Sequence, residues 1–280
     1  MKTRLTLPLV FLALLVVAPF TNGQKLKAEE IIAKHLDSIG TAEKRASLKS
    51  FIAVGDVRVE FITQKNQPAS GRIVIASEGN KIFFGMSLND TKYPHEKIIF
   101  DGNKTAVALV YTGNRSVLGN FIQSNSSIVS QGILGGTLSN AWALLSADQR
   151  KAKISSAGSK KIDGREAYAL NFNPKGGSDL EITLFFDQET FRHIRTEYKR
   201  TASAAIGRTI DDSARQLESR LKVTEDFSDF KEYHGIMVPH KYRIFYSVVG
   251  SGTTEVSWNS ELSEFAINQA LDAGTFDAGK

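Results

Sequence analysis

The chain has 280 residues, of which 23% are charged and 41% hydrophobic, and it contains no cysteine. Disulfides and cysteine-ligated structural zinc sites are therefore excluded, and a chain of this length can bury a core without them. The formal net charge is +5 at pH 7, but no run of five or six like charges occurs, so we expect no nucleic-acid partner.

Residues 1–23 have the three parts of a cleaved secretory signal peptide. A basic start is followed by an apolar run over 5–20, and small residues precede a cleavage site near Gly23. The run is shorter than the about 20 apolar residues of a transmembrane helix and closes at Pro19; a retained N-terminal anchor is the alternative. Without cysteine there is no lipobox, so we expect residues 24–280 to form one periplasmic domain without a stable membrane anchor.

The mature chain begins with a helical pattern. Apolar residues recur with i, i+3, i+4, i+7 spacing from Ala28 to Ile39, which predicts an amphipathic helix, and Gly40 is placed to end it. A second short helix is expected over 41–49, where Thr41 can cap the first turn. The two helices lead directly into the first strand.

From residue 50 onward the hydrophobic period changes to the alternation of β-strands. Short turns such as 78–80 and 101–103 join these strands, which is typical of antiparallel hairpins. The strands predicted in this first series cover 51–61, 71–77, 81–88, 95–100 and 104–111.

Residues 116–147 follow this series and carry no charged side chain. They mix apolar residues with Ser, Asn, Gln and Gly, do not alternate as strands do, and are too polar to span a bilayer. Because charged side chains are rarely buried, we expect this segment to lie against the apolar face of the sheet as short helices broken by glycines. Two interpretations remain open, a lid that moves and an ordinary buried helical connection.

A second series of strands continues to the C-terminus. Its predicted members cover 151–159, 165–173, 178–187, 191–200, 216–227, 238–249 and 253–265. No helices of 10–15 residues separate the strands, which argues against a parallel sheet of βαβ units. The pattern therefore predicts an α+β fold that is mainly antiparallel β, with about 11–12 strands.

Residues capable of catalysis form no recognisable motif. His234 and His240, with Glu232, could meet as a metal site, but isolated histidines at such spacing are usually structural. The Gly-Ser-Gly sequence at 250–252 lies between two strands, as a hairpin turn does, and lacks the G-x-S-x-G pattern of a nucleophile elbow. A hydrolase whose two carboxylates meet only in the fold stays open. The prediction is nevertheless a protein that is not an enzyme, with no catalytic residue, metal or cofactor.

Several short motifs occur in a characteristic order. After the first helix and the strand entry at 48–50 come DGREAY at 163–168, FFDQET at 185–190 and FSDFKEYHGIMVP at 227–239. In this order the chain resembles the bacterial outer-membrane lipoprotein-sorting, or LolA-like, superfamily of periplasmic proteins. The resemblance covers most of the mature chain and depends on the order of the motifs more than on any one of them.

The resemblance implies an open half-barrel whose concave apolar face is covered by helices and holds the acyl chains of lipids or lipoproteins. The expected function is a lipid- or lipoprotein-binding carrier. The alternative is an envelope sensor or assembly module that binds a protein partner through the same fold. The residues expected to line the lipid-binding cavity are Phe84, Met86, Phe121, Ile122, Ile128, Val129, Ile133, Leu134, Trp142, Leu145, Tyr168 and Phe185.

Overall fold

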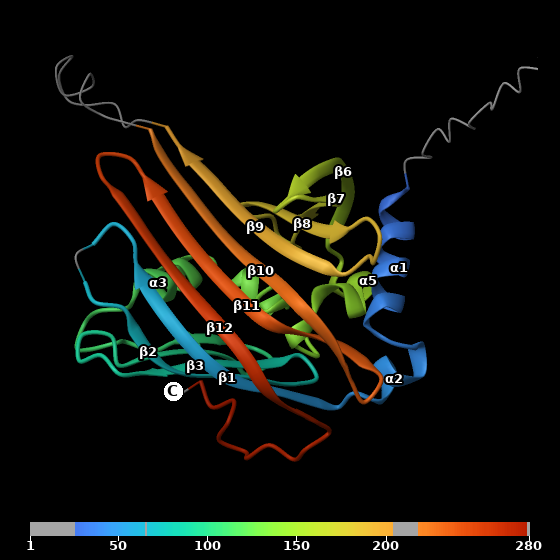
Figure 1. The fold of residues 1–280 in the computed structure, drawn as a ribbon, viewed down its shortest axis with the longest axis horizontal. Coiled ribbons are helices and arrows are strands. Elements are labelled where there is room, and N and C mark those ends of the chain that lie inside the picture. Colours follow the sequence, from blue (N-terminus) through green and yellow to red (C-terminus); the bar gives the residue numbers. More distant parts are fainter. Residues whose placement is uncertain (1–25, 65, 204–217, 279–280) are drawn as a thin grey trace, which may run out of the picture.

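The computed structural model describes residues 26–278 apart from residue 65 and residues 204–217 (Figure 1). The predicted signal peptide lies outside the described residues. Among the residues described, no helix is long and apolar enough to cross a membrane.

Two helices precede the sheet, as predicted. Helix α1 (Ala28–Ile39) buries Ile31 and Ile39 against the core, and α2 (Ala42–Ser47) begins with the Lys44 backbone N–H donating to the Thr41 hydroxyl at 3.3 Å. Gly40 separates the two helices where the backbone of another hairpin approaches, and a Cβ there would lie 2.6 Å from the Gly235 carbonyl oxygen. Only glycine fits this crossing without a shift of the backbone.

Twelve strands form one antiparallel sheet in the order β5-β4-β3-β2-β1-β12-β11-β10-β9-β8-β7-β6. The first and last strands pair in its middle, with Val57 opposite Ser260, and the ends of the sheet at β5 and β6 remain apart, so the sheet is open. The strands are β1 (Ser50–Phe61), β2 (Ala69–Glu78), β3 (Lys81–Leu88), β4 (His95–Phe100), β5 (Thr105–Val107), β6 (Lys153–Ile162), β7 (Arg165–Asn173), β8 (Glu181–Asp187), β9 (His193–Ala202), β10 (Ser219–Tyr233), β11 (Ile236–Val249) and β12 (Thr253–Ile267).

Two predicted strand boundaries are wrong. The strand expected over 104–111 ends at Val107, because the Arg115 guanidinium donates to the Val107 carbonyl oxygen and the chain then folds back in a tight turn. Strand β10 extends six residues beyond the predicted end at residue 227, to Tyr233. His234 and Gly235, with φ of 52° and 83°, then make a two-residue turn into β11, the conformation that favours tight hairpins.

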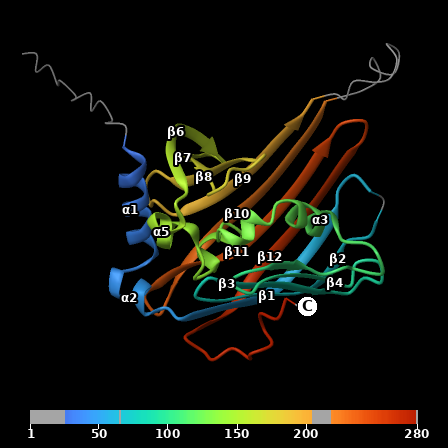
Figure 2. The same ribbon diagram turned by 180° about the vertical axis from the view of Figure 1, so that it is seen from behind.

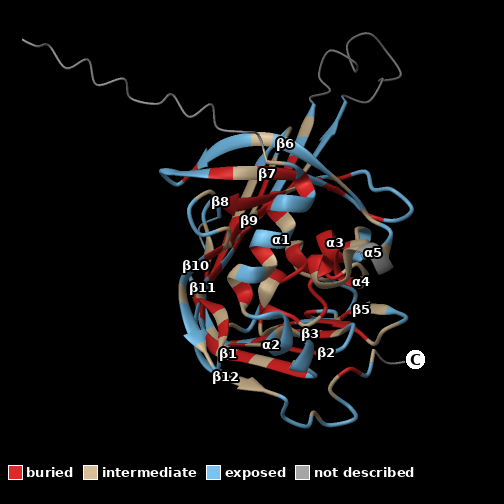
Figure 3. Cartoon of the chain, turned by 90° about the vertical axis from the view of Figure 1, so that its right-hand side faces the viewer, coloured by how far each residue is buried: buried red, intermediate tan, exposed pale blue. Residues whose placement is uncertain are grey.

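The segment of residues 116–147, here called the central segment, lies on the inner face of the curved sheet (Figure 2). With the first turn of the following helix it contains the short helical pieces α3 (Val117–Ser124), α4 (Ser127–Ser130), η1 (Gly136–Leu138), η2 (Ala143–Ser146) and α5 (Ala147–Arg150). Buried residues of this segment and of the strands form one hydrophobic core between them (Figure 3). The prediction of an open, mainly antiparallel half-barrel with helices on its concave face is confirmed.

Candidate functional site: the filled half-barrel and its outer face

The central segment fills the concave side of the sheet with its own side chains. Rings from the segment meet rings from the sheet, as where Phe121 lies 5.8 Å from Tyr198 between ring centroids. The expected container is therefore occupied by the protein itself in this conformation. The large apolar residues of the segment that are at most 6% exposed are Leu118, Phe121, Ile122, Ile128, Val129, Ile133, Leu134, Leu138, Trp142 and Leu144.

Most residues predicted to line the cavity meet in this core. Phe84 and Met86 contribute from β3, and Leu145 and Tyr168 pack at its margin. Phe185 does not join them, because it points to the opposite face of β8 and packs in a separate small cluster. The predicted lining residues buried in the main core are Phe84, Met86, Phe121, Ile122, Ile128, Val129, Ile133, Leu134 and Trp142.

A buried carboxyl group, Glu225 of β10, holds the middle of the segment. It is 1% exposed and accepts hydrogen bonds from the Gly135 backbone N–H at 2.7 Å and from the hydroxyls of Tyr198 and Tyr242 at 2.5 Å each. Burial raises the pKa of the Glu225 carboxyl above its usual value, although the two tyrosine hydroxyls oppose this shift. Glu225 thus links one backbone amide of the segment to three neighbouring strands, β9, β10 and β11.

A second buried carboxyl group, Glu96 of β4, holds the start of the segment. Its carboxylate accepts from the Tyr93 hydroxyl at 2.7 Å and from the Ser116 hydroxyl, and Ser116 also accepts the Gly119 backbone N–H as the N-cap of α3. The Trp258 indole donates to the Tyr93 hydroxyl at 3.0 Å. Burial raises the pKa of the Glu96 carboxyl. The first helix of the segment is therefore capped through the sheet.

A pair of buried histidines holds the end of the segment. The Trp142 indole N–H donates to His35 Nε2 at 3.0 Å, and His35 Nδ1 lies 3.0 Å from the Phe191 carbonyl oxygen. The acceptor role of Nε2 places the proton on Nδ1, so His35 is the neutral tautomer that donates to Phe191. Burial lowers the pKa of His35 to about 4 and that of His193, whose ring stacks on Trp142 at 4.7 Å, well below its usual value.

The segment contacts the sheet through side chains, not through a shared backbone ladder. Among the described residues, no backbone–backbone hydrogen bond joins residues 117–146 to a strand; one further link is the Asn140 backbone N–H donating to the Ser77 hydroxyl at 2.8 Å. Polar atoms at this interface remain without a protein partner, at a cost of about 1–3 kcal/mol each. In the described part of the chain these buried atoms are Gln131 Oε1, Thr137 Oγ1, Asn140 Nδ2 and His193 Nδ1.

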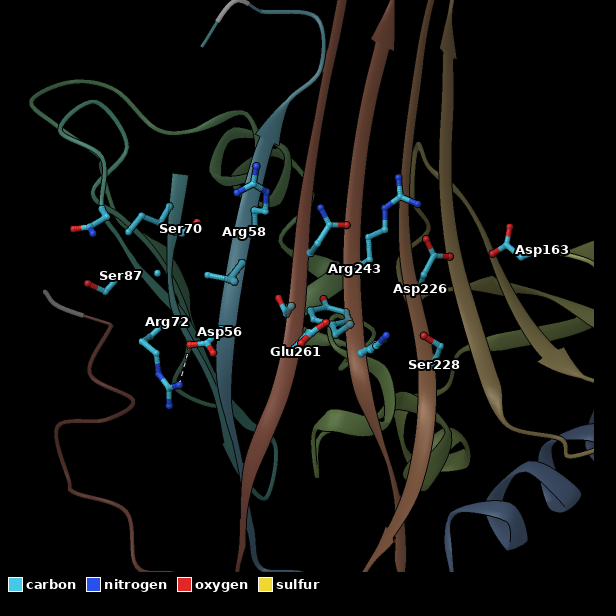
Figure 4. A pocket seen from close by; sticks show the side chains of 18 residues that line it. Asp56, Arg58, Ser70, Arg72, Ser87, Asp163, Asp226, Ser228, Arg243 and Glu261 are labelled. Carbon is cyan, nitrogen blue, oxygen red and sulfur yellow. Dashed lines mark hydrogen bonds and ion pairs between the residues drawn. The ribbon is translucent and has the colours of Figure 1, made fainter. Parts of the chain in front are cut away.

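The outer face of the sheet carries a hollow of about 980 Å³, here called the outer trough (Figure 4). It crosses strands β3, β2, β1, β12, β11 and β10, and its side chains alternate along the strands with residues of the buried inner face. Its charged lining residues are Arg58, Arg72, Lys241 and Arg243, with Asp56, Asp163, Asp226 and Glu261.

The charges of the outer trough balance one another, four basic against four acidic. Arg72 pairs with Asp56 at 3.0 Å, and at the other end Arg195, beside the trough, pairs with Asp163 at 3.0 Å and with Asp226. The lining also contains several serines and asparagines. This composition suits a polar partner of mixed charge and does not suit an acyl chain.

The histidines considered as metal ligands lie apart from any such cluster. The His234 ring lies 4.5 Å from that of Tyr233, and the His240 ring 4.8 Å from that of Phe265. Within residues 26–64, 66–203 and 218–278, no group of three or more His, Asp or Glu side chains could hold a metal ion.

The buried carboxyl groups are not among the site residues predicted from the sequence. Glu225 occupies an inward position of an alternating strand, between Val223 and Phe227, so the alternation itself indicates a buried acid. His35 lies on the buried face of α1, four residues after Ile31 and four before Ile39, and this spacing indicates a buried histidine. Their partners could not be found in the same way, because the tyrosines and the segment amide come from distant parts of the sequence.

No protein-family model matches the chain, and no curated protein matches it. Solved structures are similar in fold. A LolA superfamily protein from Nitrosomonas europaea is 14% identical, with a TM-score of 0.47, over 90% of this chain and 97% of that one. An outer membrane lipoprotein-sorting protein domain from Vibrio parahaemolyticus is 12% identical, with a TM-score of 0.44, over 88% and 97% of the two chains.

A DUF1329 family protein from Desulfovibrio piger is 11% identical, with a TM-score of 0.42, over 89% of this chain and 97% of that one. The open antiparallel sheet with helices on its concave face, which the resemblance implied, is present in this chain. At these identities the likeness extends to the fold alone.

Proposed function

We propose that this protein is a periplasmic carrier that binds acyl chains of lipids or lipoproteins between the concave face of its sheet and the central segment. In this proposal the described conformation is the closed, empty state. The segment moves away from the sheet to admit the ligand, and residues 1–23 direct export and are removed.

The observation that carries the proposal is the way the segment is attached. Every strand of the sheet pairs with its neighbours through backbone hydrogen bonds, and in the described chain this pairing does not include the segment. The segment is interrupted at Gly132, Gly135 and Gly136, which have φ of 71°, 76° and 50°. The sheet can therefore keep its backbone hydrogen bonds while the segment moves, and the orphaned polar atoms at the interface favour a second arrangement.

The energetics of such an exchange are balanced. Apolar burial contributes roughly 25 cal/mol per Å² whether the buried surface belongs to the segment or to an acyl chain. A ligand that replaces side chains such as Phe121 and Ile133 against the sheet recovers the burial that they lose. Uptake and release can then both proceed without a large net driving force, as a carrier requires.

An engineered disulfide tests whether the segment must move. The Asn140 backbone N–H donates to the Ser77 hydroxyl at 2.8 Å, so the two residues are in direct contact across the interface, and the chain has no other cysteine. We expect the oxidised N140C/S77C variant to bind a fluorescent fatty acid at least about tenfold more weakly than the reduced variant. Reduction should restore binding.

The matched control is N171C/T183C, which joins paired residues of β7 and β8 and leaves the segment free. Its oxidation should not change probe binding. Equal binding by both redox states of N140C/S77C would contradict a moving segment. Absence of probe binding by every form, together with no lipid in native mass spectra of protein purified from its own host, would contradict the carrier proposal itself.

A second candidate function is an envelope sensor or assembly module that binds a protein partner. The filled core and the charge-balanced outer trough favour it. In that case, replacing Arg243 and Glu261 with alanine should abolish the capture of a defined partner from envelope extracts, while the N140C/S77C disulfide should have no effect on it.

A further inference from the structure

Loops of the first half of the sheet and the β11–β12 turn come together at one end of the half-barrel, here called the loop end. Antiparallel pairing places them there, because Val59 pairs with Ala69, Gly71 with Leu88, and Val249 with Thr253. Figures 1 and 2 show these connections on the same side of the molecule. We propose that the loop end docks on the surface of an anionic phospholipid bilayer.

Exposed apolar side chains concentrate at the loop end. Ile62 is 52% exposed, Leu109 43%, Tyr111 58% and Val249 46%. These are the exposed large hydrophobic residues of the described chain, and all four stand in loops or at a strand end on this side of the half-barrel. Single exposed apolar residues are common on protein surfaces, but their confinement to one end marks an interaction surface.

Contacts join these positions into one continuous edge. The Ile62 backbone N–H donates to the Glu255 carbonyl oxygen at 2.9 Å, two residues from Thr253, the pairing partner of Val249. Ile62 and Val249 therefore flank the start of β12.

The same edge continues in the other direction along the first half of the sheet. The ring of Phe61, next to Ile62, lies 6.3 Å from that of Tyr93, and His95 Nε2 lies 3.0 Å from the Leu109 carbonyl oxygen. Leu109 in turn precedes the exposed Tyr111 by two residues. The apolar side chains thus follow the edge from β11 to β5.

Basic residues lie beside this edge at the ends of β9 and β10. Lys199 and Lys222 pair with Glu197, Arg220 pairs with Glu218, and Arg200 points to the inner side beside Tyr246. These six residues carry a net charge of 4 − 2 = +2. Anionic headgroups attract such residues, by about fivefold in affinity for each basic side chain near the surface. Apolar loop tips next to basic residues are the pattern of a bilayer-facing surface.

The form of the surface also favours a bilayer over a protein partner. In the described part of the chain, its apolar side chains stand on separate loops and a strand end, and none of the four lines the outer trough or the hollow beside α3. A bilayer interface accepts apolar side chains singly and adapts to their spacing. A protein partner would need a complementary, well-packed patch.

The seam between the central segment and the sheet opens beside the loop end. A hollow of about 260 Å³ there is lined by Phe121 of α3, by Leu221, Tyr246 and Val248 of the strands, and by Arg200. On the proposed carrier function, a lipid leaving the bilayer would meet this seam first, with Arg200 beside its headgroup. The docking itself requires no such transfer.

Tryptophan placed at each end of the molecule tests the orientation of docking. Ser251 lies in the exposed β11–β12 turn at the loop end, and Asn80 lies in the exposed β2–β3 turn at the opposite end. On the chain without residues 1–23, we expect Ser251→Trp to increase binding to vesicles of phosphatidylethanolamine and phosphatidylglycerol and to be quenched by brominated lipid. Asn80→Trp should show neither effect, and equal behaviour of the two variants would overturn the proposal.

A variant that lacks the exposed apolar side chains tests whether they are needed for docking. Replacing Ile62, Tyr111 and Val249 together with serine should lower partitioning into these vesicles by about tenfold or more, with an unchanged urea unfolding midpoint. Unchanged partitioning would overturn the proposal, as would loss of a protein partner by this variant without loss of vesicle binding. Binding of a fluorescent fatty acid without vesicles should persist in the variant, so the carrier proposal and the docking proposal fail independently.

Discussion

Polar side chains have different surroundings on the inner and outer faces of the same sheet. On the inner face, the buried carboxyl groups of Glu225 and Glu96 form no ion pair with a described residue and are compensated by hydroxyl and amide donors. On the outer face, carboxylates and guanidinium groups are exposed in pairs, as with Arg72 and Asp56. The inner groups fix the segment in place, whereas the outer pairs are available to solvent and to a partner.

This difference has an energetic consequence. A buried polar group that loses its partner carries its full desolvation cost, while an exposed ion pair exchanges one solvated state for another. Changes on the inner face should therefore alter stability and the position of the central segment together. Changes on the outer face should alter partner binding and leave stability nearly unchanged.

The largest loss of stability is expected from a substitution at Trp142, where the central segment is packed against the buried histidines. Trp142 is fully buried, stacks on His193 and donates to His35. Trp142→Ala should lower the free energy of unfolding by about 3–5 kcal/mol, because it leaves a cavity and removes the donor to His35. Urea unfolding measures this loss. The control Tyr111→Ala, at an exposed position, should change the free energy of unfolding by less than about 0.5 kcal/mol. Similar losses for both variants would contradict the view that the buried contacts of the segment hold it in place.

Acidification should loosen the inner face through His35. Its pKa is about 4 in the folded protein and near 6.5 when exposed, so the unfolded chain binds the proton more readily. Stability from this group is present above pH 6.5 and is lost as the pH falls towards 4, by roughly 3 kcal/mol in total. Protonation would also remove the Nε2 lone pair that accepts the Trp142 indole N–H.

The difference in unfolding free energy between the parent and His35→Gln isolates the pH dependence due to His35. The glutamine amide oxygen can accept the Trp142 indole N–H, but it does not titrate. Glu225 and Glu96, whose pKa values are raised, contribute in the opposite sense, with stability that declines as the pH rises above 4.5. Their contribution cancels in the comparison. A parent–variant difference in unfolding free energy that is constant from pH 7 to 4 would show that His35 does not carry the acid sensitivity.

The loss of stability caused by a change at Glu225 should grow with the number of hydrogen bonds that the change removes. Glu225→Leu leaves the Tyr198 and Tyr242 hydroxyls and the Gly135 N–H without their acceptor. It also removes the burial cost of the carboxyl, so we expect a net loss of about 2 kcal/mol. Glu225→Gln keeps an acceptor and should cost about half as much. Denaturant titration of the two variants measures the difference, and a larger loss for glutamine than for leucine would contradict this account.

The two faces also differed in how far the sequence predicts them. Strands were predictable because alternation and glycine-containing turns, such as Gly164 between β6 and β7, are local signals. The burial of the central segment followed from its lack of charge. That its side chains occupy the concave side of the sheet did not follow, because the fit of Trp142 and Leu138 into the space under the sheet depends on the curvature of strands far away in the sequence.

The outer trough was not predictable for a related reason. Asp56, Glu261 and Lys241 lie in one row across three strands, and Asp226 lies one strand further on. A row of this kind exists only once the register of all the strands is set. The alternation of polar and apolar residues along a strand predicts which residues point outward. It does not predict which residue of the next strand lies beside each of them.

The smallest effect on stability is expected on the outer face. Arg72 pairs with Asp56 and with Glu264 at 2.7 Å, and all three side chains are about half exposed or more. Arg72→Ala should therefore lower the unfolding free energy by less than about 1 kcal/mol, and salt should reduce even this difference. Urea unfolding at low and high sodium chloride measures both. A loss as large as that of Glu225→Leu would show that the outer ion pairs stabilise the fold. The proposed difference between a stabilising inner face and a binding outer face would then be wrong.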